Sequence, residues 1–151
     1  LDLKFNDVVE RVKDEIDEKG EFEIIRGKTL IKLKPIYFDR NSSYLTFDAK
    51  EELNREIQIM QKYPGLIIEC TSHTDSRESN KYNDWLTDRR AKRSIEYILS
   101  KGINPKRISG MGYGESQLVN NCAENMKCPD EEHQLNRRTE FEIINSDIIQ
   151  Q

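Results

Sequence analysis

The chain has 151 residues, a length typical of one domain that buries about two-thirds of the surface exposed by its unfolded form. Its 24 basic and 28 acidic residues give a net charge of −4 without a polybasic run, so nucleic-acid binding is not expected. No apolar stretch approaches the roughly 18 to 20 residues of a membrane-spanning helix, and the start at Leu1 lacks the charged and apolar regions of a signal peptide. The chain, which starts without methionine, can be a piece of a longer protein.

The first predicted element is a helix over residues 4–19. Its apolar residues recur at helical spacing, and Gly20 supplies a stop. Those apolar positions are Phe5, Val8, Val9, Val12 and Ile16.

A β-hairpin is predicted next, from two short runs at residues 21–25 and 29–33. Arg26-Gly27-Lys28 lies between them, and its glycine can take the positive φ that a three-residue connection requires. The second arm runs past Pro35 into residues 36–39, and the proline indicates a sheet edge or a break in the ladder.

The middle of the chain predicts a helix followed by a buried strand. Asp48 and Glu51 have the spacing of a capping box, and an apolar stripe follows until Pro64-Gly65 ends the helix. The short apolar run at residues 66–71, bounded by turn residues, is typical of a buried strand. The stripe consists of Ala49, Leu53, Ile57 and Met60.

The last part of the chain predicts one more helix and two more strands. The helix starts at Ser79 or Asn80 and runs to Lys101, and Gly102 is expected as its left-handed cap. Residues 107–113 are a strand candidate, although their glycines weaken a regular ladder. A long loop at 115–133 precedes a last strand, in which apolar and acidic residues alternate.

Strands that alternate with helices favour a layered α/β sandwich with right-handed crossovers. We expect a βαβαβ-β order and a mixed sheet of about four strands with helices packed on one face. The predicted division is an N-terminal helix and hairpin extension (1–33), a main domain (34–146) and a frayed tail (147–151).

Two of the three cysteines, Cys122 and Cys128, lie close together in the predicted loop. A local disulfide between them is plausible in an oxidising compartment. Cys70 lies in an apolar run, where a thiol usually behaves as a small buried hydrophobe.

Asp75 and Arg90 are the candidate chemical groups. Asp75 follows a predicted strand and Arg90 lies in the next helix, so the two can face each other across the strand-to-helix turn. A carboxylate accepts hydrogen bonds from an ammonium, and a guanidinium binds a carboxylate in two parallel hydrogen bonds, so the pair would suit a zwitterion. From spacing alone, the alternative is that the two side chains pair with each other or lie solvated.

Several motifs together resemble the C-terminal domain of outer-membrane-protein-A-like proteins, over about residues 35 to 144. Their shared order and spacing carry the resemblance. The motifs are Ile36-Tyr37-Phe38-Asp39, His73-Thr74-Asp75-Ser76-Arg77, Tyr82-Asn83, Leu86-Thr87, Arg90-Ala91, Lys101-Gly102-Ile103, Arg107-Ile108, Gly112-Tyr113-Gly114-Glu115-Ser116 and Asn136-Arg137-Arg138.

The resemblance implies binding of peptidoglycan through the meso-diaminopimelate of its stem peptide. Asp75 would bind the amine of that residue and Arg90 its carboxylate, whereas Arg89 would face solvent. The other pocket positions implied are the backbone around Thr74, the side chains of Asn83 and Leu86, and Arg138 or Arg137. Glu78 and Ser72 stand where relatives often have glycine, and the charge of Glu78 could repel the ligand's carboxylates.

Residues 34–39 and 131–138 look like the Bacteroidetes branch of the family, in which some members are outer-membrane lipoproteins of gliding or type IX secretion machinery. We therefore expect a non-enzymatic anchor at the periplasmic face of the outer membrane, with no cofactor and no metal. The alternative is a protein-interaction module of such a machine that has the same fold, no ligand, and the 115–133 loop as its partner surface.

Overall fold

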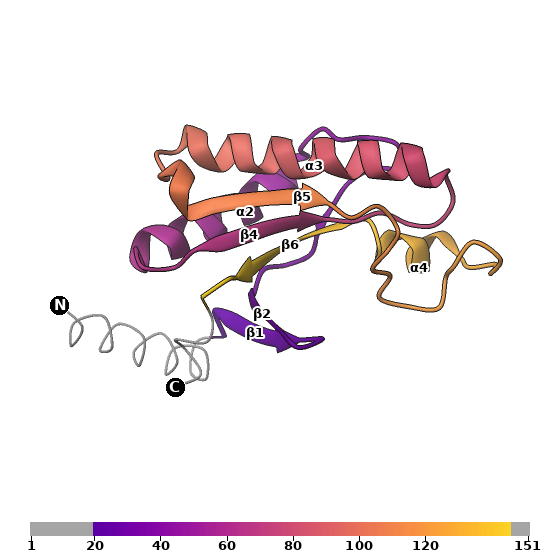
Figure 1. Ribbon diagram of the computed structural model, residues 1–151, viewed down its shortest axis with the longest axis horizontal. Helices are drawn as coiled ribbons and strands as arrows, with labels where there is room; N and C mark the ends of the chain where they lie inside the picture. Colours follow the sequence, from indigo (N-terminus) through magenta and orange to yellow (C-terminus); the bar gives the residue numbers. More distant parts are fainter. Residues whose placement is uncertain (1–19, 146–151) are drawn as a thin grey trace.

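The computed structural model describes residues 20–145, so the predicted helix at 4–19 and the predicted tail at 147–151 lie outside the described residues (Figure 1). Its six strands form one mixed sheet in the order β1-β2-β6-β4-β5, and β3 also pairs with β6. The strands are β1 (Phe22–Ile25), β2 (Lys28–Ile31), β3 (Ile36–Tyr37), β4 (Ile68–Ser72), β5 (Ile108–Gly112) and β6 (Arg138–Ile143). The helices are α2 (Phe47–Lys62), α3 (Asn80–Ser100), the 3₁₀ helix η1 (Pro105–Arg107) and α4 (Asp130–Gln134).

The two long helices, α2 and α3, cover one face of the sheet, as predicted (Figure 1). β4 pairs in parallel with β5 and antiparallel with β6, which makes the sheet mixed. The apolar sides of both helices and of the sheet form a single cluster that contains Leu53, Ile68 and Ile98. Cys70 is fully buried in it, and this burial raises the pKa of its thiol. Among residues 20–145, none of the helices combines the length and the apolar character needed to cross a bilayer.

The hairpin is confirmed, but its turn is one residue shorter than predicted. Arg26 and Gly27 form the turn with φ values of 53° and 76°, and Lys28 already pairs with Ile25. Positive φ at both central residues is the requirement of a two-residue hairpin turn that follows strand twist. The hairpin continues the main sheet, because Leu30 pairs with Glu142 of β6.

Helix α2 ends where predicted, but the predicted capping box is wrong. The helix begins at Phe47, and the hydroxyl of Thr46 accepts a hydrogen bond from the amide of Ala49 at 3.1 Å. Asp48 lies within the first turn, where its negative charge interacts favourably with the positive end of the helix dipole. Its side chain does not cap the helix. The predicted start was therefore two residues late.

Helix α3 begins where predicted, with Ser79 as its N-cap, and ends at Ser100, one residue before the predicted end. Gly102, at a φ of 93°, follows the C-cap Lys101. The glycines of β5 do not weaken its ladder; Gly112 instead permits close packing. A β-carbon at Gly112 would lie 2.2 Å from the hydroxyl oxygen of Thr87, so only glycine lets α3 approach β5 this closely. The loop at 115–133 contains the start of α4, which is too short and polar to show a periodic pattern.

Candidate functional site

Asp75 lies in the loop between β4 and α3, with only 3% of its surface exposed. Its Oδ1 accepts a hydrogen bond from the backbone amide of Arg77 at 3.1 Å. Its Oδ2 accepts from the guanidinium groups of Arg77 at 3.0 Å and Arg137 at 2.9 Å. Burial would raise the pKa of Asp75, but the hydrogen bonds from the two arginines outweigh it and lower that pKa to about 2. Asp75 is therefore a fixed anion at neutral pH.

Arg90 lies in α3 with no exposed surface, and its guanidinium stacks on the Phe38 ring at 4.8 Å. Its nitrogens donate to three backbone carbonyls, of Ser42 at 2.8 Å, Asp39 at 3.1 Å and His73 at 3.4 Å. Burial and the charge of Arg137 lower its pKa to about 10, so it stays cationic at neutral pH. Within residues 20–145 it forms no ion pair with a carboxylate. Asp75 and Arg90 thus neither pair with each other nor lie solvated.

The structure brings Arg137, and not Arg138, to Asp75. Arg137 is 5% exposed and also donates to the carbonyl of Phe38 at 3.3 Å. Arg138 begins β6, and its side chain donates to the carboxylate of Glu140 at 2.8 Å and the carbonyl of Gln117 at 3.0 Å. Because successive residues of a strand point to opposite faces, Arg138 is directed away from the Asp75 group.

Of three further predicted residues, Asn83 and Thr74 bond to the loop around Asp75 or to its neighbours, and Leu86 is buried. Asn83 donates from its side-chain amide to the carbonyls of Asp75 at 3.3 Å and Glu78 at 3.2 Å, which ties the loop to α3. The backbone amide of Thr74 already donates to the carbonyl of Gly114 at 3.0 Å. Leu86 is 3% exposed. Asn83 and Thr74 therefore fix the loop's conformation in this structure.

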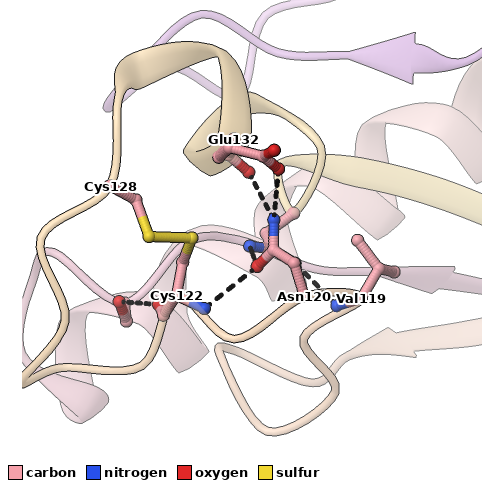
Figure 2. The surroundings of a disulfide bond; sticks show 7 residues. Val119, Asn120, Cys122, Cys128 and Glu132 are labelled. Atoms are coloured by element: carbon pink, nitrogen blue, oxygen red, sulfur yellow. Dashed lines mark hydrogen bonds between the residues drawn. A yellow bond between two sulfur atoms is a disulfide. The ribbon is translucent and has the colours of Figure 1, made fainter.

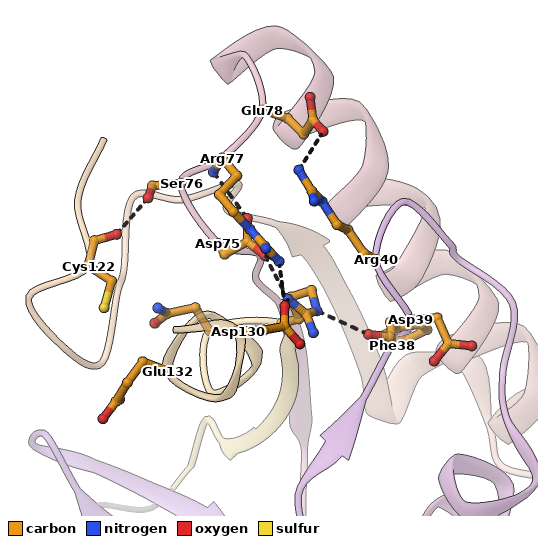
Figure 3. A network of polar contacts seen from close by, with 12 residues as sticks. Phe38, Asp39, Arg40, Asp75, Ser76, Arg77, Glu78, Cys122, Asp130 and Glu132 are labelled. Carbon is orange, nitrogen blue, oxygen red and sulfur yellow. Dashed lines mark hydrogen bonds and ion pairs between the residues drawn. The ribbon is translucent and has the colours of Figure 1, made fainter. Parts of the chain in front are cut away.

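Two ion pairs at the rim of the site were not anticipated from the sequence (Figure 3). Arg77 contacts Asp130 at 3.1 Å, and Arg40 contacts Glu78 at 3.5 Å. Arg40 thus compensates the charge of Glu78, for which the sequence predicts repulsion of a ligand's carboxylates. The only signal for Arg77 is its place two residues after Asp75, where aspartate commonly accepts a local backbone hydrogen bond.

The predicted disulfide between Cys122 and Cys128 is present and closes a segment with a sequence separation of 6 (Figure 2). We call residues 115–133 the bridged loop. Its conformation is also held by Asn120, which accepts from the amide of Cys122 and donates to Glu132. Ser76 donates to the carbonyl of Cys122 at 2.6 Å, so the bridged loop is attached directly to the loop that carries Asp75.

Removing the disulfide should lower the free energy of unfolding by about 2 kcal/mol, because the bridge restricts a short loop in the unfolded chain. Urea unfolding of the oxidised protein and of a Cys122→Ser/Cys128→Ser variant would measure this difference. Reductant should shift the wild type to the variant's midpoint and leave the variant unchanged. Equal midpoints for oxidised wild type and variant would contradict the prediction.

His73 has a structural role in this arrangement. It has no exposed surface, shares a hydrogen bond with the hydroxyl of Thr71 at 3.0 Å and stacks on Tyr113. Burial and the nearby charge of Arg138 lower its pKa to about 3, so the ring is neutral at physiological pH.

A family model and several known proteins match this chain in sequence. The sequence model described as the OmpA family matches residues 37–129. The peptidoglycan-associated lipoprotein of Brucella melitensis is 33% identical over 87 residues, which cover 58% of this chain and 52% of that protein. The photosystem I P700 chlorophyll a apoprotein A2 of Gloeobacter violaceus is 32% identical over 145 residues, covering 93% of this chain but only 16% of that protein.

A solved structure of a MotB-like protein from Desulfovibrio vulgaris has the same fold. It superposes with a TM-score of 0.69 at 19% identity and covers 91% of this chain and 88% of that chain. The chain spans about half the length of the peptidoglycan-associated lipoprotein that it matches, at 52%.

Proposed function

Because the chain belongs to the OmpA family, we propose that it binds peptidoglycan non-covalently and anchors an envelope protein to the cell wall. A relative whose name states association with peptidoglycan supports this function. We place the domain at the periplasmic face of the outer membrane, and the disulfide is compatible with that oxidising compartment.

The proposed ligand is the side chain of meso-diaminopimelate, which carries an ammonium and a carboxylate on one carbon. The observation that supports it most is the buried guanidinium of Arg90, which has no carboxylate partner among residues 20–145 although Asp75 is nearby. Arg137 contacts the buried carboxylate of Asp75, and the charge of Asp75 also acts on the buried guanidinium of Arg90. These three groups together carry one positive charge in excess. A ligand carboxylate would balance it.

Each end of the ligand has a partner in this proposal. A guanidinium has five N–H donors, and the three carbonyls bonded to Arg90 take three of them, which leaves two for a ligand carboxylate. Asp75 would accept from the ammonium. Both side chains are nearly inaccessible, at 0% and 3% exposure, so a ligand can enter only when more exposed neighbours move.

Titration calorimetry with a diaminopimelate-containing muropeptide and with its lysine-containing equivalent would test the proposal. The lysine form lacks the side-chain carboxylate and should bind at least about tenfold more weakly, since it leaves the buried guanidinium unpaired. Absence of heat with either muropeptide would contradict wall binding. That result would favour the other function, a protein-interaction module of a secretion or gliding machine that uses the bridged loop.

A further inference from the structure

The guanidinium of Arg77 lies between two carboxylates at the rim of the site (Figure 3). Its Nη2 is 3.0 Å from Oδ2 of Asp75 and 3.1 Å from Oδ1 of Asp130. Hydrogen bonds from an ammonium to a carboxylate span about 2.7 to 2.9 Å, so a ligand ammonium bound to Oδ2 of Asp75 would compete with Arg77 for a position beside that oxygen. Arg77 already supplies a cation at that position from within the chain.

The charges of this cluster balance while Arg77 is in place. Asp75 and Asp130 contribute two negative charges, and Arg77 and Arg137 contribute two positive charges, all within contacts of 3.5 Å or less. Without Arg77 the remaining three groups carry one net negative charge. Arg90, the neighbouring buried cation, adds one positive charge to both states. The departure of Arg77 therefore lowers the local charge by one unit, which makes the open cluster more favourable for an ammonium than the closed one.

Burial divides the cluster into an inner pair and an outer pair. The side chains of Asp75 and Arg137 are 4% and 6% exposed, whereas those of Arg77 and Asp130 are 22% and 64% exposed. Exposed ion pairs are weak because water competes for both partners, so the outer pair can separate while the inner pair stays. The position of Asp130 is in turn fixed by the bridged loop, since it follows Cys128 by two residues and the loop is bonded to Ser76.

We infer that Arg77 is an intramolecular competitor for the ligand's ammonium, held over Asp75 by Asp130 of the bridged loop. This inference rests on the proposed function. Ligand binding then requires Arg77 to leave Asp75, and the affinity of the domain for the stem peptide is lower than the inner groups alone would give. Arg77 is a specificity-determining residue, because only a cation that pairs with Asp75 better than Arg77 does can enter.

The test compares muropeptide binding by the wild-type chain, Arg77→Ala and Arg89→Ala. Arg89 is the matched control, because it lies on α3, is exposed and stacks on Trp85, so its removal changes the net charge equally. Calorimetry with the diaminopimelate muropeptide should show roughly fivefold tighter binding for Arg77→Ala and no change for Arg89→Ala. A merely structural role of Arg77 would give the opposite direction, since loss of a supporting contact weakens binding.

Each remaining outcome has a distinct meaning. Binding by Arg77→Ala alone, with none by the wild type, supports the competition and contradicts wall binding by the wild-type chain. Equal or weaker binding by Arg77→Ala, with a wild type that does bind, overturns the competition and leaves wall binding intact. If neither protein binds the muropeptide, the proposed function fails and the inference fails with it.

Discussion

Arg90→Ala should reduce affinity for the diaminopimelate muropeptide by about 2 to 5 kcal/mol, the usual cost of removing one partner from a buried charged pair. The variant should also unfold more easily, by roughly 3 kcal/mol, because the carbonyls of Asp39, Ser42 and His73 lose a donor in a buried site. Calorimetry well below the variant's melting temperature measures the first effect, and urea unfolding measures the second.

Arg107→Ala is the control that separates the two effects. Arg107 also donates to three backbone carbonyls, of Met60, Tyr63 and Leu66, but it precedes β5 at the opposite end of that strand from the Asp75 loop. The Arg107→Ala variant should therefore be less stable than the wild type but keep its affinity for the muropeptide. Wild-type affinity in a folded Arg90→Ala variant would show that Arg90 only supports the loop at 39–42.

The free energy of unfolding of the wild-type chain should fall as pH rises from about 6.5 to 8. The Glu56→Gln variant should not show this fall. Glu56 has no exposed surface, and neither carboxylate oxygen has a hydrogen-bond partner among the described residues. Burial raises its pKa to about 8, although the charge of Arg107 opposes this. The protonated form favours folding, so its contribution is present below pH 4.5 and is lost as pH rises through about 8.

The size of this loss of stability is set by Glu56, and the pH range in which it is visible is limited by His73. The slope from Glu56 is at most about 1.4 kcal/mol per pH unit, which gives a loss of roughly 2 kcal/mol across the window. His73 acts in the opposite sense below pH 6.5, because its lowered pKa makes the neutral ring favour folding. Above that pH the contribution of Glu56 is therefore clearest.

Urea unfolding at several pH values, with Glu52→Gln as the control, would measure the effect. Glu52 lies one turn earlier on α2 and is also buried, but its carboxylate accepts a hydrogen bond from the amide of Lys34 at 2.7 Å. The control should keep the wild-type slope. A slope that persists in Glu56→Gln would assign the pH dependence to another group.

Local patterns predicted most of the fold because the sequence signals agree with the packing. The glycine turn of the hairpin, the serine cap of α3 and Gly102 each meet a backbone requirement that only a few residue types satisfy. The start of α2 was misplaced because two nearby residues meet the same requirement. Thr46 and Asp48 both suit a cap, and in the structure the hydroxyl of Thr46 accepts the hydrogen bond from the Ala49 amide.

The choice between Arg137 and Arg138 could have been made from the sequence. Phe141 and Ile143 are buried against the helices, so a period of two places residue 137 on the same side and residue 138 on the other. By contrast, the contact between Arg77 and Asp130 joins segments 53 residues apart, and no local pattern reports it. Glu56 was missed because a glutamate at helical spacing from Leu53 and Met60 is normally interpreted as solvent-facing.

The order of the strands has a consequence for synthesis of the protein. β6 is formed late in the chain, yet it lies inside the sheet, with β2 and β3 along one edge and β4 along the other. Arg137, which directly precedes it, supplies the buried cation of the proposed binding site. A nascent chain that stops before this segment lacks both the strand that joins the two halves of the sheet and one side of the site. Attachment to the wall would therefore be confined to molecules whose translation has passed β6.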